Sequence, residues 1–311
     1  MSAGSGQMGG PMLTVGSVAL DSVRTPFGEV EEELGGAASY ASVSASFFTS
    51  ARMVAVIGED FPGRHVSRFA SRGIDLAGLE RAPGKTFRWR GYYEYDLNQA
   101  HTLETALNVF ETFRPTLPEN YRHSPYVFLA NIDPALQLSV LDQVRRPKLV
   151  ACDTMNYWIE HAHEAVLKVL ARCDIALVNE AEARELVGRP NLLACAREIM
   201  NLGPGVVIVK KGEHGAMMLS QGGYFVAPGY PLEEVKDPTG AGDTFAGGLM
   251  GYLARCGETD DAAVRKAMVC GTVMASFAVE DFSLDRLLRL TQEEIADRYH
   301  EILAMTRVEA F

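Results

Sequence analysis

The sequence predicts an α/β fold, a three-layer α/β/α sandwich with a mostly parallel central sheet and a small antiparallel β lid. Apolar runs of strand length recur along the chain and are rich in Val, Ile and Leu, as in strands buried on both faces. Segments with apolar residues at helical spacing separate these runs, as in right-handed βαβ units. Two other segments alternate aromatic, charged and apolar residues, which is typical of antiparallel strands with one solvated face.

The expected elements follow in chain order. Residues 1–11 are rich in Gly and Ser and predict a disordered leader, so the folded domain is expected over residues 12–311. The buried strands are expected at Leu13–Leu20, Met53–Ile57, Tyr126–Ala130, Leu149–Cys152, Ile175–Val178 and Val206–Val209. The helices between them are expected at Pro134–Val144, His161–Ala171 and Leu192–Leu202. The lid strands are expected within residues 20–34 and 86–97.

Composition and charge limit the classes of partner. The 311 residues are 47% hydrophobic and 22% charged, which is typical of a globular chain with a large core. Lys+Arg number 29 and Asp+Glu 40, and the net charge of −11 would repel a phosphate backbone. We therefore expect no nucleic-acid partner. A nucleotide substrate would need a local positive field from backbone amides, a metal ion or a few basic side chains.

The cysteines and the lack of long apolar runs indicate a compartment. Five widely spaced cysteines with no C-x-x-C pair are typical of buried thiols in a reducing environment. No apolar run approaches the roughly 20 residues that span a bilayer. We therefore expect a cytoplasmic protein with no membrane partner.

The most informative segment runs from Asp237 to Gly248 and reads DPTGAGDTFAGG. Its glycines lead directly into a helical pattern that ends at Gly257, so free backbone N–H groups converge at the positive end of a helix dipole, where an anion binds. Asp243, in the first helical turn, has the wrong charge for holding phosphate but is suited to accept the proton of an attacking hydroxyl. The alternative is a flexible turn followed by an N-cap aspartate.

This segment resembles the C-terminal signature of the ribokinase-like, or PfkB, family of carbohydrate and nucleoside kinases. Other segments resemble further family motifs in the expected order: Gly35-Gly36 with Val56–Gly63 the N-terminal signature, Asn179–Glu182 the N-x-x-E motif, and Val209–Gly215 the nucleotide loop. The resemblance implies a ribokinase-like fold and an ATP-dependent kinase that requires Mg²⁺.

The resemblance also assigns the chemical step. Asp243 would be the general base that deprotonates a substrate hydroxymethyl group, which then attacks the γ-phosphate of ATP. The backbone amides of Gly240, Ala241 and Gly242, together with that of Asp243, would form an anion hole for the transferring phosphoryl group.

The nucleotide and its metal are assigned to the ends of the central strands, where open α/β sheets bind ligands. Asn179 and Glu182 would arrange hydrated Mg²⁺ around the ATP phosphates, although dipole complementation alone explains an acid in a first helical turn. Lys210 is a candidate neighbour of a phosphate or the ribose. Gly212 and Gly215 would allow close approach of the nucleotide, or form a tight hairpin, or both.

Two weaker assignments complete the nucleotide side. Ala275 lies in a helical segment rich in small residues that is a candidate to flank the adenine, and core packing is the simpler explanation. Asp237 is a candidate ligand for a monovalent cation, as in some relatives, and an Asx-turn explains it equally well.

The acceptor side departs from the family pattern. Asp21 matches the aspartate that accepts hydrogen bonds from substrate hydroxyls, with a charged turn residue as the alternative, and Gly35-Gly36 matches the diglycine at the lid hinge. Ala19 and Tyr40 stand where relatives commonly carry Asn. Losing two amides and gaining an aromatic ring makes ribose itself a poor candidate substrate.

Further acceptor contacts are expected from two places. Arg88 lies in the aromatic lid segment, which suits stacking on a base or docking an anionic substrate, or else packing in a homodimer through the lid. Asp153 and Asn156 begin at a strand end and resemble the D-x-N segment beside the cleft.

Together these residues predict a kinase that uses ATP and Mg²⁺ to phosphorylate a primary hydroxymethyl group on a sugar or sugar derivative. A nucleoside such as adenosine is the alternative acceptor. A non-catalytic sensor of a sugar or nucleotide is the alternative of a different class, and the intact Asp243 with its glycines argues against it.

Overall fold

The computed structural model describes residues 9–97 and 99–309. Most of the predicted leader, residues 1–8 of 1–11, therefore lies outside the described residues. Gly10 already belongs to the folded domain, because its backbone N–H donates to the carbonyl of Ala254 at 3.0 Å.

The central sheet has the strand order β13-β12-β11-β10-β9-β8-β1-β4-β5 among the described residues. Its strands are β1 Met12–Val15, β4 Ala51–Gly58, β5 Asp75–Ala82, β8 Tyr126–Leu129, β9 Leu149–Asp153, β10 Ile175–Asn179, β11 Val206–Lys210, β12 Ala216–Ser220 and β13 Gly223–Ala227. All neighbouring pairs are parallel except β11–β12 and β12–β13, which form antiparallel hairpins at one edge. The sheet is mostly parallel, as predicted.

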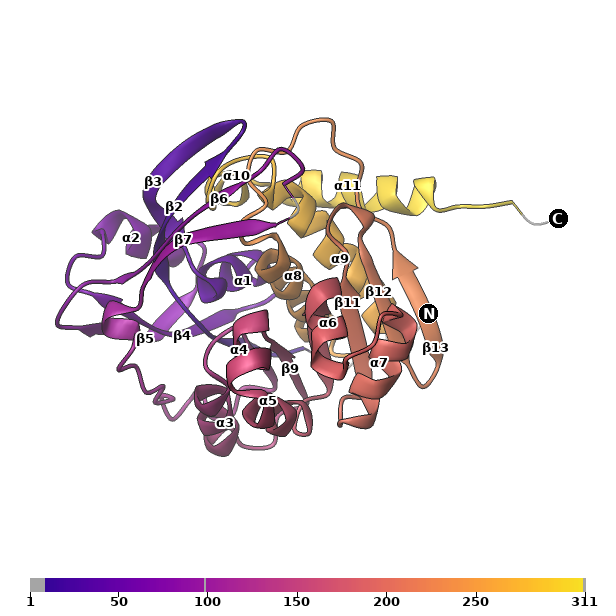
Figure 1. Ribbon diagram of the computed structural model, residues 1–311, viewed down its shortest axis with the longest axis horizontal. Helices are drawn as coiled ribbons and strands as arrows, with labels where there is room; N and C mark the ends of the chain where they lie inside the picture. The colour runs from indigo at the N-terminus through magenta and orange to yellow at the C-terminus, as the bar shows by residue number, and fades with distance from the viewer. Residues whose placement is uncertain (1–8, 98, 310–311) are drawn as a thin grey trace, which may run out of the picture.

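Helices cover both faces of this sheet, as Figure 1 shows. The helices are α1 Ala37–Ala45, α2 Gly63–Ser71, α3 Pro134–Gln143, α4 Asn156–His161, α5 His163–Leu170, α6 Glu180–Val187, α7 Leu192–Asn201, α8 Ala241–Cys256, α9 Asp261–Ala278, α10 Asp285–Leu288 and α11 Gln292–Met305, with 3₁₀ turns η1 Asn108–Phe110 and η2 Gly212–His214. Within β11, Val207 and Val209 join the hydrophobic cluster under α3 and α5–α7, and Ile208 joins the cluster under α1, α8 and α9. Burial of both faces explains why this strand is apolar at successive positions.

Two boundaries differ from the sequence prediction. The expected strand Leu13–Leu20 is two elements, because β1 ends at Val15 and the next strand begins at Ala19. Between them the Ser17 hydroxyl accepts from the N–H of Ala37 and its carbonyl from the N–H of Ala38, so the chain turns to satisfy the first amides of α1. The expected helix His161–Ala171 is likewise divided at Ala162, which ends α4 and precedes α5.

The lid is a separate sheet with the order β3-β2-β6-β7 among the described residues. Its strands are β2 Ala19–Thr25, β3 Gly28–Gly35, β6 Phe87–Tyr93 and β7 Ala100–Ala106. The β2–β3 and β6–β7 pairs are antiparallel, as expected, but β7 lies beyond the predicted range 86–97, and the two hairpins join through a parallel β2–β6 pairing. In Figure 1 the lid lies at the upper left, above α1 and β4.

Three adjacent strands, β9, β10 and β11, end in polar residues at the same edge of the central sheet. The amino terminus of α8 faces this edge: the Cβ position at Gly242 is 3.3 Å from Nζ of Lys210, the last residue of β11. Helix α8 packs closely on α1, since the Cβ position at Gly247 would lie 2.3 Å from the Ala41 carbonyl oxygen. None of the helices within the described ranges is both long and apolar enough to cross a membrane.

Candidate active site

The amino terminus of α8 is shaped by Gly240. This residue is the N-cap and has φ 74°, in the left-handed region that favours glycine. A Cβ at Gly240 would lie 2.4 Å from the ring of Tyr40, so the aromatic ring leaves no room for a side chain. The backbone at the start of α8 is therefore held by a close contact between two segments 200 residues apart.

The amides of this helix end are only partly used by the protein. Ala241 N–H donates to the carbonyl of Pro238 at 3.2 Å, and Thr244 N–H makes the first helical bond to Gly240 at 2.8 Å. Within the described chain no side chain caps the helix. Helix geometry leaves the first-turn amides of Gly242 and Asp243 without an intrahelical carbonyl.

Asp243 lies half-buried in the first turn of α8. The pKa of its carboxyl is raised to about 7, mainly by burial and also by the negative charge of Asp153. The ammonium of Lys210 and the backbone N–H of Asp243 itself act in the opposite direction. A carboxylate with a pKa near neutrality is well matched to accept a proton from an alcohol.

Asp153 and Lys210 form a buried ion pair at the strand ends, with 2.5 Å between Oδ2 and Nζ. Asp153 ends β9 and Lys210 ends β11. Burial lowers the pKa of Lys210, but the attraction of Asp153 and Glu182 outweighs burial and holds that pKa above its usual value. Lys210 is therefore a permanent cation between two acids.

Asn179 and Glu182 form a capping box at the start of α6. The Glu182 N–H donates to Asn179 Oδ1 at 2.9 Å, and the Asn179 N–H donates to Glu182 Oε2 at 2.7 Å. Asn179 Nδ2 also donates to Glu182 Oε1 at 2.6 Å. Burial raises the pKa of the Glu182 carboxyl to about 7, against the attraction of Lys210.

Asp237 is fully buried before the start of α8. Its Oδ1 accepts from the N–H of Thr239 at 2.9 Å, which is the Asx-turn that the sequence allowed, and its Oδ2 accepts from the N–H of Ser283 at 3.5 Å. Burial raises the pKa of its carboxyl. Binding of a monovalent cation here stays a prediction.

On the acceptor side, Asp21 of β2 lies against the diglycine. A Cβ at Gly35 would lie 1.9 Å from Asp21 Oδ2, and Gly36, with φ 92°, is the N-cap of α1. The pKa of Asp21 is raised to about 7, mainly by burial; the charges of Asp237 and Asp243 act in the same direction, and a hydrogen bond from the Gly36 N–H acts against them. Asp21, Asp237 and Asp243 therefore form one group of acids that repel one another.

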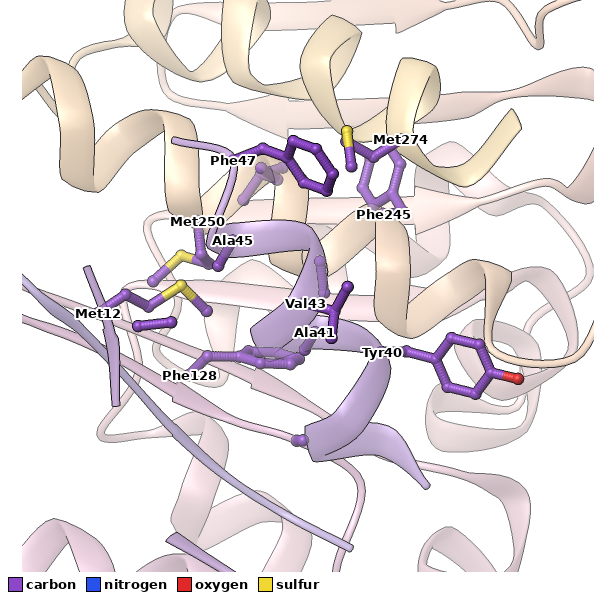
Figure 2. Packing of buried hydrophobic residues seen from close by; sticks show 14 of the residues in the cluster. Met12, Tyr40, Ala41, Val43, Ala45, Phe47, Phe128, Phe245, Met250 and Met274 are labelled. Atoms are coloured by element: carbon purple, nitrogen blue, oxygen red, sulfur yellow. The ribbon is translucent and has the colours of Figure 1, made fainter. Parts of the chain in front are cut away.

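Tyr40 of α1 is almost fully buried, with its ring against Gly240. Figure 2 shows its ring leaving α1 on the side away from Phe128 and Met12, with the hydroxyl turned out of the hydrophobic cluster. Burial and the charges of Asp237 and Asp21 hold its pKa well above the usual value, so the phenol stays neutral.

The sequence offered Tyr93 only as one of five aromatic residues in the lid segment and did not single out Thr239, but the structure brings the two together. Thr239 Oγ1 donates to the Tyr93 hydroxyl at 3.3 Å, which joins lid strand β6 to the loop before α8. Burial raises the pKa of Tyr93 to about 12. Tyr93 had no individual signal in the sequence, because it is one of five aromatic residues in the lid segment and its partner is 146 residues away.

Other predicted residues have protein partners. Arg88 binds Glu32 of lid strand β3 at 2.7 Å and Asp60, in the loop between β4 and α2, at 2.8 Å. Asn156, the first residue of α4, donates to Glu185 of α6. Their contacts with a substrate stay predictions.

The predicted nucleotide loop is a tight connection between β11 and β12. Gly212, with φ 55°, begins η2, and Gly215, with φ 86°, follows its last residue. The predicted tight hairpin between β11 and β12 is therefore present. Ala275 lies half-buried on α9, against the hydrophobic cluster under α8. Contacts of these residues with a nucleotide stay predictions.

Comparison with known proteins identifies the family. A family model described as pfkB family carbohydrate kinase matches residues 14–281. The chain is 28% identical over 249 residues to a cytidine kinase of Thermococcus kodakarensis, covering 78% of this chain and 88% of the relative. It is 31% identical to a deoxyribokinase of Salmonella typhi over 121 residues, covering 37% of this chain and 38% of the relative.

The fold is also that of a solved structure. The crystal structure of aminoimidazole riboside kinase from Salmonella enterica, complexed with aminoimidazole riboside and an ATP analog, superposes with a TM-score of 0.73 at 20% sequence identity. The superposition covers 93% of this chain and 99% of that chain. The chain therefore belongs to the pfkB family of carbohydrate kinases, ribokinase-like phosphotransferases that use ATP with Mg²⁺ to phosphorylate an alcohol group of a sugar or nucleoside.

Proposed function

We propose that this enzyme transfers the γ-phosphoryl group of ATP to the primary hydroxymethyl group of a nucleoside. The observation that carries the proposal is a pair of interacting aspartates: Asp243 at the uncapped amino terminus of α8, and Asp21 on lid strand β2, against the diglycine. Asp243 is suited to accept the hydroxymethyl proton, and Asp21 to hold other hydroxyls of the same substrate.

The chemical step needs few groups. The acceptor oxygen loses its proton to Asp243 and forms a bond to the γ-phosphorus, while the bond from that phosphorus to the ADP oxygen breaks. Amides of Gly240, Gly242 and Asp243 are placed to stabilise the charge on the transferring group, as in other phosphoryl transfers. The Ala241 amide would join them only by leaving its bond to Pro238.

The acidic strand ends suit a hydrated magnesium ion. Among the residues that the structure describes, Asp153, Glu182 and Asp243 lie near one cation, Lys210, so this group carries an excess of buried acid. Burial and the charge of Asp153 raise the pKa values of both Glu182 and Asp243. A divalent cation beside Glu182 would offset this excess of acid and neutralise the ATP phosphates. The adjacent turn at Gly212 and Gly215 would lie along the nucleotide.

Two observations favour a nucleoside over a free sugar. The cytidine kinase alignment covers most of both chains, whereas the deoxyribokinase alignment covers little more than a third of each. In addition, Tyr93 gives the acceptor side a neutral, partly exposed aromatic side chain, which suits the apolar face of a nucleoside. A free sugar is the second candidate, because Asp21 recognises hydroxyls common to both classes.

A substrate panel tests the proposal. The protein is incubated with Mg²⁺-ATP and nucleosides, pentoses, ketohexoses or sugar acids, and ADP and the phosphorylated product are measured. We expect kcat/KM for the best nucleoside to exceed that for its free pentose by about tenfold or more, the value of one or two good contacts to the base. A 5′-deoxynucleoside is the control, since it should bind without turnover.

Other results would replace the proposal. Faster turnover of a free sugar would assign the enzyme to that class. Binding of nucleosides without any turnover would indicate a sensor.

A further inference from the structure

Lys210 occupies an unusual place in the row of strand ends. Strands β9, β10 and β11 are parallel neighbours, with Asn179 paired to Lys210 in the register. The Lys210 side chain reaches past β10 to Asp153, so its ammonium lies above the centre of the row. Its side chain is 18% exposed and that of Asp153 is 3% exposed, so the cation is the more accessible partner.

The same ammonium lies against the start of α8. The Cβ position at Gly242 is 3.3 Å from Lys210 Nζ, which places a full positive charge beside the uncapped first turn of the helix. Amides of a helix end and a fixed cation at one point form a strong site for a multiply charged anion. An ion pair with only a structural role would not have to lie beside the first turn of α8. Buried ion pairs by themselves also add little to stability.

We propose that Lys210 is a catalytic residue whose ammonium contacts the transferring phosphoryl group, and that Asp153 is a positioning residue that holds this ammonium beside Gly242. This inference depends on the proposed function only for the identity of the acceptor. No proton moves to or from Lys210: the acceptor proton goes to Asp243, the new bond joins the acceptor oxygen to phosphorus, and the bond to ADP breaks with its electron pair.

The charge flow explains why a cation is needed there. Negative charge on the equatorial oxygens must be stabilised during transfer, and Asp243 becomes neutral as it takes the acceptor proton. The local charge at Asp243 therefore changes while that of Lys210 stays fixed. Asp153 limits the motion of the flexible lysine side chain, which lowers the entropy cost of each contact with phosphate.

The test compares binding of ATP and ADP, which needs no acceptor. Affinities of Mg²⁺-ATP and Mg²⁺-ADP are measured by calorimetry for the wild type and for Lys210→Met. Loss of a charged contact to the γ-phosphate should weaken ATP by about tenfold or more and leave ADP within about twofold. Turnover with the best acceptor should fall by about 10² to 10³, as on removal of one oxyanion donor.

Four further variants separate this role from a structural one. Lys210→Arg should restore part of the preference for ATP. Asp153→Asn should lower kcat less than Lys210→Met, and the double variant, which leaves no buried unpaired charge, should match Lys210→Met in kcat. Lys148→Met is the control, because its ammonium bonds the carbonyl of Gly257, away from the row of strand ends.

The binding measurement decides the inference. A folded Lys210→Met protein, or the folded double variant, that keeps the wild-type ratio of ATP to ADP affinity would overturn it, whatever the acceptor proves to be. If no acceptor in the panel is phosphorylated but Lys210→Met changes the ratio of ATP to ADP affinity, the proposed acceptor is wrong and the role of Lys210 stands.

Discussion

The phosphoryl end and the acceptor end of the candidate active site are built differently. At the phosphoryl end, Asp153, Asn179 and Lys210 are the last residues of adjacent parallel strands, and Asp243 is in the first turn of a 16-residue helix. At the acceptor end, Asp21 and Tyr93 stand on strands of a second sheet. The Tyr93–Thr239 contact joins this sheet to the loop before α8. The first end is fixed by the central sheet, and the second depends on how the lid is placed.

The largest expected effect comes from the phosphoryl end. Asp243→Asn should lower kcat by about 10² to 10⁴ if the carboxylate accepts the acceptor proton. Affinity for Mg²⁺-ATP, measured by calorimetry, should change little. Asp142→Asn, at an exposed ion pair with Arg172, is the matched control and should behave as the wild type. Turnover close to wild type in Asp243→Asn would move the chemistry elsewhere.

The pH profile sharpens the same assignment. The pKa of Asp243 is raised to about 7, and the carboxyl must be deprotonated to act as a base. Wild-type kcat/KM should therefore fall about tenfold for each pH unit below 7 and level off above it. Lys210 lowers this pKa, so Lys210→Met should move the acid limb to higher pH. A profile that is flat from pH 5 to 8 would contradict both statements.

The phosphoryl end could be read from the sequence because its residues are local in sequence. Asp243 follows its glycines directly, and Asn179 and Glu182 are three residues apart in a capping box. Asp153 and Asn179 also stand where apolar strands end, and parallel strands bring such points to one edge. The fold was predictable for the same reason, since strand and helix periodicity recurs along the chain.

The acceptor end could not be read in this way. Tyr40 was assigned to the substrate, but its ring also packs under Gly240, which no local pattern indicates. The charge of Arg88 suits an anionic ligand, yet its guanidinium is paired with Glu32 and Asp60. Contacts between segments far apart in the sequence determine what these side chains are free to do.

A middle-sized effect is expected from Asp21→Asn. Loss of a charged acceptor for substrate hydroxyls should lower kcat/KM for the acceptor by about 10- to 100-fold, with ATP affinity unchanged. The folded-state pKa of Asp21 is raised from 3.8 to about 7, so its favourable contribution to stability is complete below pH 3.8 and is lost as the pH rises through 7.

The same variant should therefore be more stable than the wild type at pH 8. Asn resembles the protonated carboxyl, and the expected gain in the free energy of unfolding is about 0.5–2 kcal/mol, as for other sites where function opposes stability. Urea unfolding at pH 8 measures it. A less stable Asp21→Asn protein would show that the repulsion among Asp21, Asp237 and Asp243 is already relieved.

The smallest effect tests the connection between the two ends. Tyr93→Phe removes a neutral hydrogen bond to Thr239, so kcat should fall by about 2- to 10-fold. If this bond helps to hold the lid against the start of α8, its loss should let water reach the γ-phosphate more often, and ADP formed per phosphorylated acceptor should rise. Tyr92→Phe is the control, because the Tyr92 ring stacks on His101 within the lid. If Tyr93→Phe and the wild type form the same amount of ADP per phosphorylated acceptor, the lid is placed by its sheet alone. The acceptor end is then as fixed as the phosphoryl end.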